Sequence, residues 1–374
     1  MEKDGILRCF GIVAEECGIL PVGNGHINDT FKAVDSRTGR SYILQRINHN
    51  VFRDVDLLQE NIGKVTAHIR RKLEASGETD IDRKVLTLVK RGDSEKTYLQ
   101  DGDSYWRVEL MITDAETRES VTQENARHAG VAFGRFQEML SDMPDVIGES
   151  IPDFHNMELR LLQLDEAVKA DVAGRLGTVR ELLYELRKRA EHACLAERLY
   201  REGRLSKRIC HCDTKVSNML FDSNGSVLCV IDLDTVMPSF VFSDFGDFLR
   251  TAANNGDEDD RDLDRVEFDM DIYRAFTEGY LEGAGGFLTE TEIANLPYAA
   301  ERFAYMQAVR FLTDYLNGDT YYRISYPDHN LVRARAQFKL LQSIEGCLPE
   351  MAELTDRLAS KYAACPPGKS MPRM

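Results

Sequence analysis

Apolar and polar residues alternate along the first part of the chain, and this pattern predicts β-strands. Residues 21–34 are expected to form a strand, a glycine turn and a returning strand, and residues 41–48 another strand. Segments 85–89 and 106–112 would complete a small sheet. Apolar residues recur at helical spacing from 55 to 73. The pattern therefore predicts a small sheet with one long helix.

Helical spacing dominates the rest of the chain. The candidate helices are 125–140, part of 167–201, 272–282, 289–316 and 330–345. Two short apolar runs, around Ile209 and at 227–231, are expected to pair as a hairpin through the turn at 222–225. These patterns predict an α+β fold, with a small strand-rich lobe over 1–112 and a larger helical lobe over 113–374.

Size and composition agree with two lobes and restrict the classes of function. The 374 residues exceed what one hydrophobic core usually organises. The sequence has no apolar run long enough to span a membrane and no signal peptide at its start, so we expect a cytoplasmic protein without a membrane partner. A formal net charge of −16 argues against a nucleic-acid partner, because phosphates attract lysine and arginine.

Cysteine usage gives little support for a structural metal. Cys210 and Cys212 flank His211, but this is not a zinc-finger spacing and no second Cys/His pair lies close in sequence. Reduced thiols suit a cytosolic enzyme.

Residues 211–218, His-Cys-Asp-Thr-Lys-Val-Ser-Asn, carry the most specific chemical signal. They fit H-x-D-x-x-x-x-N, a catalytic loop in which the aspartate is the base and the asparagine binds magnesium. Asp213 is therefore the candidate base, and Lys215 is expected to contact the γ-phosphate and neutralise charge in the transition state. Asn218 offers Mg²⁺ a neutral oxygen ligand.

Two aspartates compete for the second magnesium-binding position. Asp232 ends an apolar strand and is followed by Asp234, whereas Asp244 belongs to a literal Asp-Phe-Gly. We favour Asp232, with Asp234 as a further ligand, because the strand should end beside the catalytic loop. Asp244 and Asp247 are then expected to brace that loop or to cap the helix beginning near Phe245.

The first lobe also holds candidate nucleotide contacts. Gly23 and Gly25 fit a turn that covers phosphates, although a plain hairpin turn has the same pattern. The backbone of Met111 and Ile112 is expected to form a hinge that contacts adenine.

A cation is expected on the strand at 41–48. Gln45 and Arg46 occupy the place of the strand lysine that holds the α- and β-phosphates in kinases. Arg46 could do this bidentately if it faces the nucleotide, with Glu60 as its partner. An exposed ion pair is the alternative.

The loop at 211–218 and the segment 230–238, Val-Ile-Asp-Leu-Asp-Thr-Val-Met-Pro, resemble the aminoglycoside phosphotransferase and choline kinase superfamily. Within it, segments 23–28, 42–48 and 310–315 resemble the N-acetylhexosamine 1-kinases, and the resemblance runs from about residue 21 to about residue 336. It implies a bilobal protein-kinase-like fold with nucleotide in the cleft between the lobes.

The same resemblance implies a reaction. ATP and Mg²⁺ would be used to phosphorylate the anomeric hydroxyl of N-acetylglucosamine or N-acetylgalactosamine, giving the sugar 1-phosphate. The residues that match the family's sugar contacts are His26, Arg310 and Tyr321. Each has a structural alternative, namely a turn contact, an ion pair and a core position.

Two other functions stay open. One is a kinase for another small alcohol, such as choline, homoserine or an aminoglycoside. The other is a pseudokinase that binds nucleotide without catalysis, which intact Asp213, Asn218 and Asp232 disfavour. Cys212 in place of the protein-kinase arginine, and the missing A-P-E motif, argue against a protein substrate.

Overall fold

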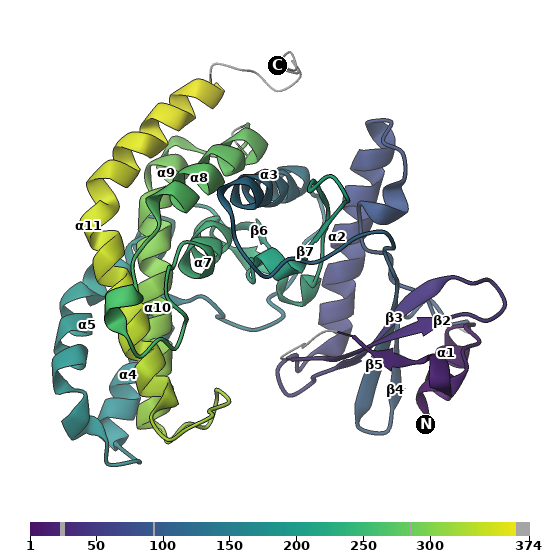
Figure 1. The fold of residues 1–374 in the computed structure, drawn as a ribbon, viewed down its shortest axis with the longest axis horizontal. Helices are drawn as coiled ribbons and strands as arrows, with labels where there is room; N and C mark the ends of the chain where they lie inside the picture. Colours follow the sequence, from purple (N-terminus) through teal and green to yellow (C-terminus); the bar gives the residue numbers. More distant parts are fainter. Residues whose placement is uncertain (23–26, 93, 285, 364–374) are drawn as a thin grey trace. The chain divides into compact units, whose positions relative to one another are not determined.

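The computed structural model describes residues 1–22, 27–92, 94–284 and 286–363, which form two compact units (Figure 1). Unit 1 comprises Met1–Arg118, Asp142–Pro152 and Ser217–Met237, and unit 2 comprises Glu119–Ser141, Asp153–Val216 and the chain from Pro238 onward. Unit 1 holds a five-stranded sheet and unit 2 is mainly helical, so the predicted α+β class is confirmed.

The sheet of unit 1 is antiparallel, with strand order β1-β2-β3-β5-β4. Its strands are β1 (Leu20–Pro21), β2 (Asp29–Val34), β3 (Ser41–Ile47), β4 (Tyr98–Asp101) and β5 (Ser104–Leu110). The predicted strand at 85–89 is wrong, because only Leu88 forms an isolated bridge, to Glu109. The edge strand β4, which the sequence analysis did not predict, pairs with residues 104–107 of β5, and Gly102, with φ of +59°, turns the chain between them.

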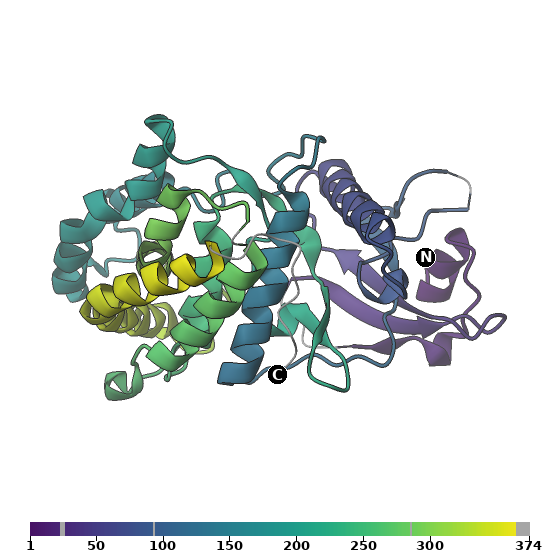
Figure 2. The same ribbon diagram turned by 90° about the horizontal axis from the view of Figure 1, so that it is seen from above.

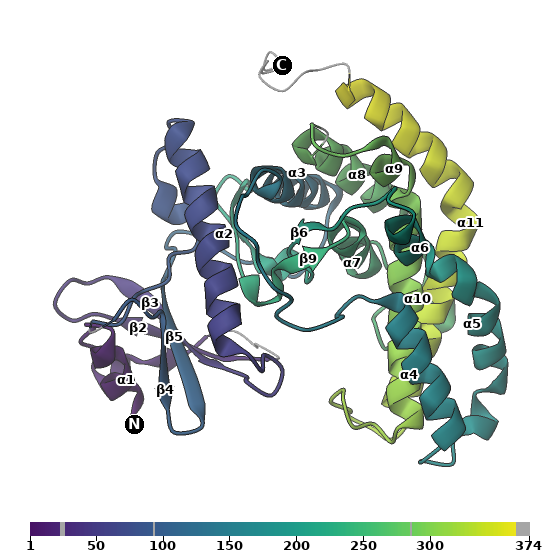
Figure 3. The same cartoon turned by 180° about the vertical axis from the view of Figure 1, so that it is seen from behind.

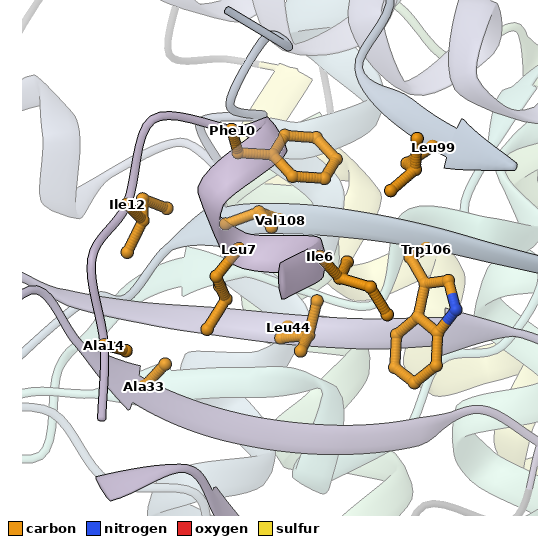
Figure 4. Packing of buried hydrophobic residues seen from close by; sticks show 10 residues of the cluster. All are labelled: Ile6, Leu7, Phe10, Ile12, Ala14, Ala33, Leu44, Leu99, Trp106 and Val108. Carbon is orange, nitrogen blue, oxygen red and sulfur yellow. The ribbon is translucent and has the colours of Figure 1, made fainter. Parts of the chain in front are cut away.

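One face of the sheet is covered by α1 (Lys3–Cys9), a short helix that the sequence analysis did not predict. Ile6 and Leu7 are fully buried against Leu44, Trp106 and Val108 of the strands (Figure 4). These residues alternate along β3 and β5, as expected for side chains on one face of a sheet. This apolar cluster fixes which strand residues point toward α1 and which point away.

The predicted long helix is α2 (Val55–Ala75), which begins at Asp54, whose side chain accepts a hydrogen bond from the Leu57 amide. Its apolar residues Leu58, Ile62, Val65 and Ile69 are buried. Asp56 accepts a hydrogen bond from Tyr98, which lies opposite Arg107 on the face of the sheet away from α1.

The hairpin predicted between the strand around Ile209 and the strand at 227–231 has the expected turn, but one of its two strands is a different segment. β8 (Val227–Val230) pairs with β7 (Met219–Phe221) through the turn at 222–225, and the strand at Ile209 takes no part. That strand, β6 (Arg208–Cys210), pairs with β9 (Met237–Ser239) instead.

Unit 2 is built from helices (Figure 3). They are α3 (Gln123–Leu140), α4 (Met157–Ala170), α5 (Arg180–Ala193), α6 (Leu195–Arg201), α7 (Phe242–Ala252), α8 (Met270–Ala284), α9 (Glu290–Ala294), α10 (Leu296–Leu316) and α11 (His329–Ala363). The predicted helix at 289–316 is interrupted at Asn295, and the one predicted at 330–345 continues to Ala363. No described helix is both long and apolar enough to cross a membrane.

Helices α3 and α8 lie side by side along their length (Figure 2). Glycines make this approach possible: a Cβ on Gly130 would lie 2.3 Å from the Phe276 carbonyl oxygen, and one on Gly279 would lie 2.0 Å from the Arg127 carbonyl oxygen. The seam therefore admits no side chain at these positions.

A similar contact fixes α7 against α10. A Cβ on Gly246 would lie 2.2 Å from the Ala299 carbonyl oxygen. Helix α7 thus has one position on α10, and it carries Asp244, Asp247 and Arg250 to a defined place beside the loop that follows β6.

Candidate active site

The loop at 211–216 follows β6 in unit 2 and is anchored by buried groups. His211 is fully buried and meets the rings of Phe133 and Phe136 at 5.7 and 6.0 Å between centroids. Its Nδ1 accepts a hydrogen bond from the Asp213 amide at 3.3 Å. Cys212 adopts a left-handed conformation, with φ of +64°. The buried His211 side chain therefore anchors the loop to the core of unit 2 and holds its turn by the hydrogen bond from Asp213.

Asp244 of α7 holds the first part of this loop. Its carboxylate accepts hydrogen bonds from the amides of His211 at 3.0 Å and Cys212 at 2.8 Å, and from Gln137 at 2.7 Å. The Asp244 carbonyl accepts a further bond from the Thr214 hydroxyl. Burial raises the pKa of Asp244, and its interactions with His211 and with these hydrogen-bond donors oppose the rise. The expectation that Asp244 braces the catalytic loop is confirmed.

Asp247 holds the next part of the loop. Its carboxylate accepts a hydrogen bond from the Thr214 amide at 3.1 Å and pairs with Arg250 at 3.2 Å. Arg250 also forms an ion pair with Glu258, with 2.8 Å between Nη1 and Oε1. Asp247 is therefore confirmed as a second brace, and it links the loop to a buried arginine.

Asp213 and Lys215 project from the loop and contact each other. Lys215 Nζ lies 2.7 Å from Asp213 Oδ1, and both side chains remain partly exposed. Burial alone would lower the pKa of Lys215, but the carboxylates of Asp213 and Asp247 outweigh it and raise the pKa. The lysine is thus a positive charge held next to the candidate base.

Asn218 and Asp232 are brought together in unit 1. The Asn218 carbonyl accepts a hydrogen bond from the Ile231 amide at 2.9 Å, and Met219 pairs with Val230 in the hairpin. Asn218 therefore lies across from the residue that precedes Asp232. Asp232 is exposed and left-handed, with φ of +60°.

Asp234 occupies a different environment, because it is buried. Its carboxylate accepts a hydrogen bond from Asn28 at 2.6 Å and pairs with the Arg107 guanidinium. The Asp234 carbonyl accepts a bond from Ser150 at 2.8 Å. These contacts hold the turn at Leu233–Thr235 that follows Asp232.

The donor set around Asp232 fits Mg²⁺. An exposed carboxylate and an amide side chain supply hard oxygen ligands, and Mg²⁺ usually takes one or two carboxylates and completes its shell with water and phosphate. Among the described residues, no group of three or more His, Cys, Asp and Glu side chains converges as a metal site. The ligand roles of Asn218, Asp232 and Asp234 remain predictions.

Arg46 lies on the face of the sheet that α1 covers. It lies opposite Trp106 in the β3–β5 register, and Trp106 packs against α1. It donates to Asp29 at 2.8 Å, while Glu60 pairs with Lys64 at 2.7 Å, so the expected Arg46–Glu60 ion pair does not form. The exposed pair that we considered as the alternative is the one present.

The expected hinge follows β5. The Met111 amide donates to the Ser41 carbonyl at 3.0 Å, which ends the β3–β5 pairing, and Ile112 is buried. Their contacts to adenine remain a prediction. Gly23, Gly25 and His26 lie outside the described residues.

Arg310 and Tyr321 are brought together in unit 2. The Arg310 guanidinium lies 5.4, 5.9 and 5.6 Å from the ring centroids of Phe154, Tyr321 and Tyr322. Tyr321 is 65% exposed, so it is not the core residue that we considered as its alternative. Gln307 accepts a hydrogen bond from Arg310 at 2.8 Å.

The loop that carries Tyr321 depends on one carboxylate. Asp314 accepts hydrogen bonds from the amides of Thr320, Tyr321 and Tyr322 at 2.8–2.9 Å, and from the Asn330 side chain at 2.9 Å. Asp314 was part of the motif at 310–315, but the sequence analysis gave it no role.

Further cations surround Arg310 that the sequence did not reveal. Burial and the charge of Arg310 lower the pKa of Arg160 to about 10. Burial, with Arg310 and Arg302 nearby, holds the pKa of His155 well below its usual value. Arg310 and Arg160 are therefore two cations that lie close together in unit 2, beside a histidine that stays neutral.

Comparisons with known proteins identify the family of the chain and its structural neighbours. Residues 18–283 match the model described as phosphotransferase enzyme family (APH). An aminoglycoside phosphotransferase from Alicyclobacillus acidocaldarius is similar at a TM-score of 0.61 and 14% identity, covering 96% of this chain and 97% of that one. A choline/ethanolamine kinase family protein from Mesorhizobium loti gives 0.52 and 16%, covering 96% and 100%. A choline kinase from Cryptosporidium parvum gives 0.53 and 13%, covering 94% and 98%.

Proposed function

Because the chain belongs to the phosphotransferase enzyme family, we propose that it transfers the γ-phosphoryl group of ATP to the anomeric hydroxyl of an N-acetylhexosamine. N-acetylglucosamine and N-acetylgalactosamine are the candidate acceptors, and the product is the sugar 1-phosphate. The observation that carries the proposal is the surroundings of Arg310, which lie in the same unit as Asp213.

The charges around Arg310 support a neutral acceptor. Arg310 and Arg160 lie close enough for Arg310 to lower the pKa of Arg160, and His155 is held neutral beside them. A cationic acceptor such as choline or an aminoglycoside would be repelled by these charges. A sugar instead offers hydroxyl and carbonyl oxygens to the guanidinium groups and an apolar ring face to the tyrosines.

Contacts within unit 2 connect this region with the catalytic loop. Asp247 bonds the Thr214 amide and pairs with Arg250. Burial raises the pKa of Tyr322, and the charges of Arg310 and Arg250 partly oppose that rise, so Arg250 lies near both sets of residues. This continuity supports an acceptor bound within reach of Asp213.

The chemistry that we propose for the loop is general-base catalysis. The anomeric hydroxyl oxygen of the sugar forms a bond to the γ-phosphorus, and Asp213 accepts the proton of that hydroxyl. The bond between the γ-phosphorus and the ADP oxygen breaks in the same step. Lys215 balances the charge of Asp213 and of the transferring phosphoryl group. Asn218 and Asp232 are the residues that would hold Mg²⁺, which neutralises phosphate charge when bound.

A coupled assay of ADP release tests this function. ATP and Mg²⁺ are supplied with N-acetylglucosamine, N-acetylgalactosamine, glucose, galactose, choline or kanamycin. Turnover selective for the N-acetylhexosamines, with phosphorus NMR showing a 1-phosphate, is the expected result. Asp213→Asn should lower kcat by about 10²–10⁴-fold while leaving nucleotide binding intact.

The other outcomes are equally informative. Turnover with choline or kanamycin alone would retain the phosphotransferase and reject the sugar acceptor. Nucleotide binding without turnover on any acceptor, in a protein whose Asp213→Asn variant behaves identically, would support the pseudokinase.

A further inference from the structure

Cys212, the residue before the candidate base, has a backbone conformation that its own side chain does not favour. Its φ of +64° lies in the left-handed region, which non-glycine residues rarely adopt. Six other described non-glycine residues share a positive φ, and every one is an aspartate: Asp80, Asp114, Asp153, Asp171, Asp232 and Asp319. An aspartate carboxylate can bond the nearby backbone and so tolerates this region, whereas a thiol makes only weak hydrogen bonds. The groups packed around Cys212 must therefore hold it in place.

Two of these surrounding groups hold Cys212 directly. The Asp244 carboxylate accepts a hydrogen bond from its amide at 2.8 Å. Burial raises the pKa of the Cys212 thiol, and a hydrogen bond from the Ser239 hydroxyl opposes that rise. Because the amide and the side chain are both held, the chain leaves Cys212 toward Asp213 in one direction.

Ser239 is one member of a relay of hydrogen-bonding side chains within unit 2. Its Oγ lies 2.7 Å from Ser243 Oγ, and Ser243 Oγ lies 3.0 Å from His155 Nδ1. A serine hydroxyl has one proton to donate. Because Ser239 gives its proton to Cys212, it accepts one from Ser243, and Ser243 in turn accepts the Nδ1 proton of His155. The relay therefore has one direction, from His155 to Cys212.

The other end of this relay lies among the residues around Arg310. The His155 ring stacks on Phe154 with 4.3 Å between centroids, and the Arg310 guanidinium lies 5.4 Å from the Phe154 centroid. The His155 carbonyl accepts a hydrogen bond from Arg302 at 2.7 Å, so the backbone is fixed there as well. The relay thus joins the proposed acceptor residues to the loop that carries Asp213.

Core packing alone does not account for the two hydroxyls. Ser243 is fully buried, and a buried hydroxyl is costly unless it is hydrogen-bonded, whereas alanine has no such requirement. The hydroxyls of Ser239 and Ser243 satisfy each other, and the proton left over is directed at Cys212. The arrangement therefore serves the conformation of the loop.

We propose that Ser239 and Ser243 are positioning residues for phosphoryl transfer, which hold Cys212 in its left-handed conformation and so direct Asp213 toward the acceptor hydroxyl. His155 is the fixed end of the relay. The inference rests on the proposed role of Asp213 as the base, but not on the identity of the acceptor. The serines make no contact with substrate, so their loss should change the rate of the chemical step and not substrate binding.

Steady-state kinetics with Mg·ATP and N-acetylglucosamine tests this role, and choline or kanamycin replaces the sugar if wild type turns over that acceptor instead. Ser239→Ala should lower kcat about tenfold and leave both KM values within about twofold, because the base is displaced but no binding group is lost. Ser239→Thr, which keeps a hydroxyl, should retain most of the wild-type kcat.

Two double variants test whether the relay acts through Cys212. Ser239→Ala combined with Ser243→Ala should have about the same kcat as Ser239→Ala alone, because the relay acts as one unit. Cys212→Gly added to Ser239→Ala should restore part of the lost kcat, because glycine takes the left-handed conformation without a brace. A kcat of that second variant no higher than in Ser239→Ala would contradict the role of Cys212.

A control serine and the wild-type protein separate the remaining outcomes. Ser343 Oγ of α11 accepts the Phe268 amide at 2.9 Å, so Ser343→Ala should lower the urea midpoint and leave kcat unchanged. Parallel changes in kcat and both KM values in Ser239→Ala would mean that the serine only supports the fold. Wild-type protein that turns over no acceptor would reject the proposed function, and the relay with it. Wild-type turnover with an unaffected kcat in Ser239→Ala rejects the inference alone.

Discussion

Asp244 accepts a hydrogen bond from the backbone amide of Cys212 at 2.8 Å, across 32 positions of sequence. A side chain of α7 thus determines the path of the loop that carries the candidate base. The Asp-Phe-Gly at 244–246, which in protein kinases signals a metal ligand, serves here as a brace.

Removal of this brace should affect stability and activity together. Asp244→Ala leaves the amides of His211 and Cys212 without their acceptor, so we expect a loss of about 3 kcal/mol in the free energy of unfolding and a fall in kcat on the order of a hundredfold. Urea denaturation and steady-state kinetics measure the two. Asp222 accepts the amides of Asn224 and Ser226 in an exposed turn, so Asp222→Asn should cost about 1 kcal/mol at most and leave kcat unchanged. Wild-type kcat in Asp244→Ala would contradict the role.

The glycine seam between α3 and α8 predicts an unusual response to alanine. Alanine has a higher helix propensity than glycine, so the substitution would ordinarily stabilise a helix. Gly279→Ala, however, places a methyl group 2.0 Å from the Arg127 carbonyl oxygen. We expect a destabilisation of about 2–4 kcal/mol in thermal or urea unfolding. Gly346 of α11 has no atom within 4 Å of its would-be Cβ, so Gly346→Ala should stabilise by about 0.5–1 kcal/mol. Similar effects of the two substitutions would refute the close packing.

The buried His155 predicts a pH dependence of stability. Its folded pKa lies well below the ordinary value of 6.5, so below pH 6.5 the unfolded chain binds more protons than the folded one. The free energy of unfolding should therefore fall as pH drops through that value, by up to about 1.4 kcal/mol per pH unit from this group. Urea titrations at pH 7.5 and 5.5 should show a smaller difference in His155→Asn than in wild type.

His192 provides a control of opposite sign. A hydrogen bond to Glu301 raises its pKa, so its contribution is present at low pH and is lost as pH rises through the raised value. His192→Asn should leave the loss of stability below pH 6.5 in place. If His155→Asn has the wild-type pH profile, the histidine does not govern it.

Arg310 should affect acceptor binding and not nucleotide binding. Arg310→Met keeps the apolar contact with the rings of Tyr321 and Tyr322 but removes the donors, so KM for the acceptor should rise about 10–100-fold while KM for ATP stays near its wild-type value. Lys361→Met, which removes an ammonium group 5.1 Å from the Tyr362 ring on α11, serves as the matched control. A parallel change in both KM values would show that the substitution disturbs more than the acceptor site.

Much of the fold could be predicted from the sequence, as could the place of the loop at 211–218 after a strand, because local spacing determines them. Helix α2 has a clear apolar period, and the brace at Asp244 follows from choosing Asp232 as the strand-end acid. Strand β4 was missed because its four residues, at the edge of the sheet, are too few to show an alternating pattern. Helix α1 is too short for periodicity to identify.

Side-chain direction was harder to predict. Gln45 and Arg46 are neighbours, and a shift of one residue exchanges the two faces of a strand, so the choice depended on knowing what α1 covers. Alternation in the sequence from Tyr105 to Glu109 places Arg107 and Glu109 on one face, a signal that could have been used. The contact of Arg107 with Asp234 joins residues 127 positions apart, and local patterns contain no information about it.

The dependence of the 318–322 loop on Asp314 has a consequence for engineering the protein. The loop contributes Tyr321 and Tyr322 near Arg310, yet three of its amides converge on a single carboxylate of α10. The backbone of residues 320–322 is therefore held by a residue of α10, whatever side chains the loop carries. Libraries that vary residue 321 and its neighbours, with Asp314 held constant, would therefore test whether this loop sets acceptor preference without altering the loop at 211–218.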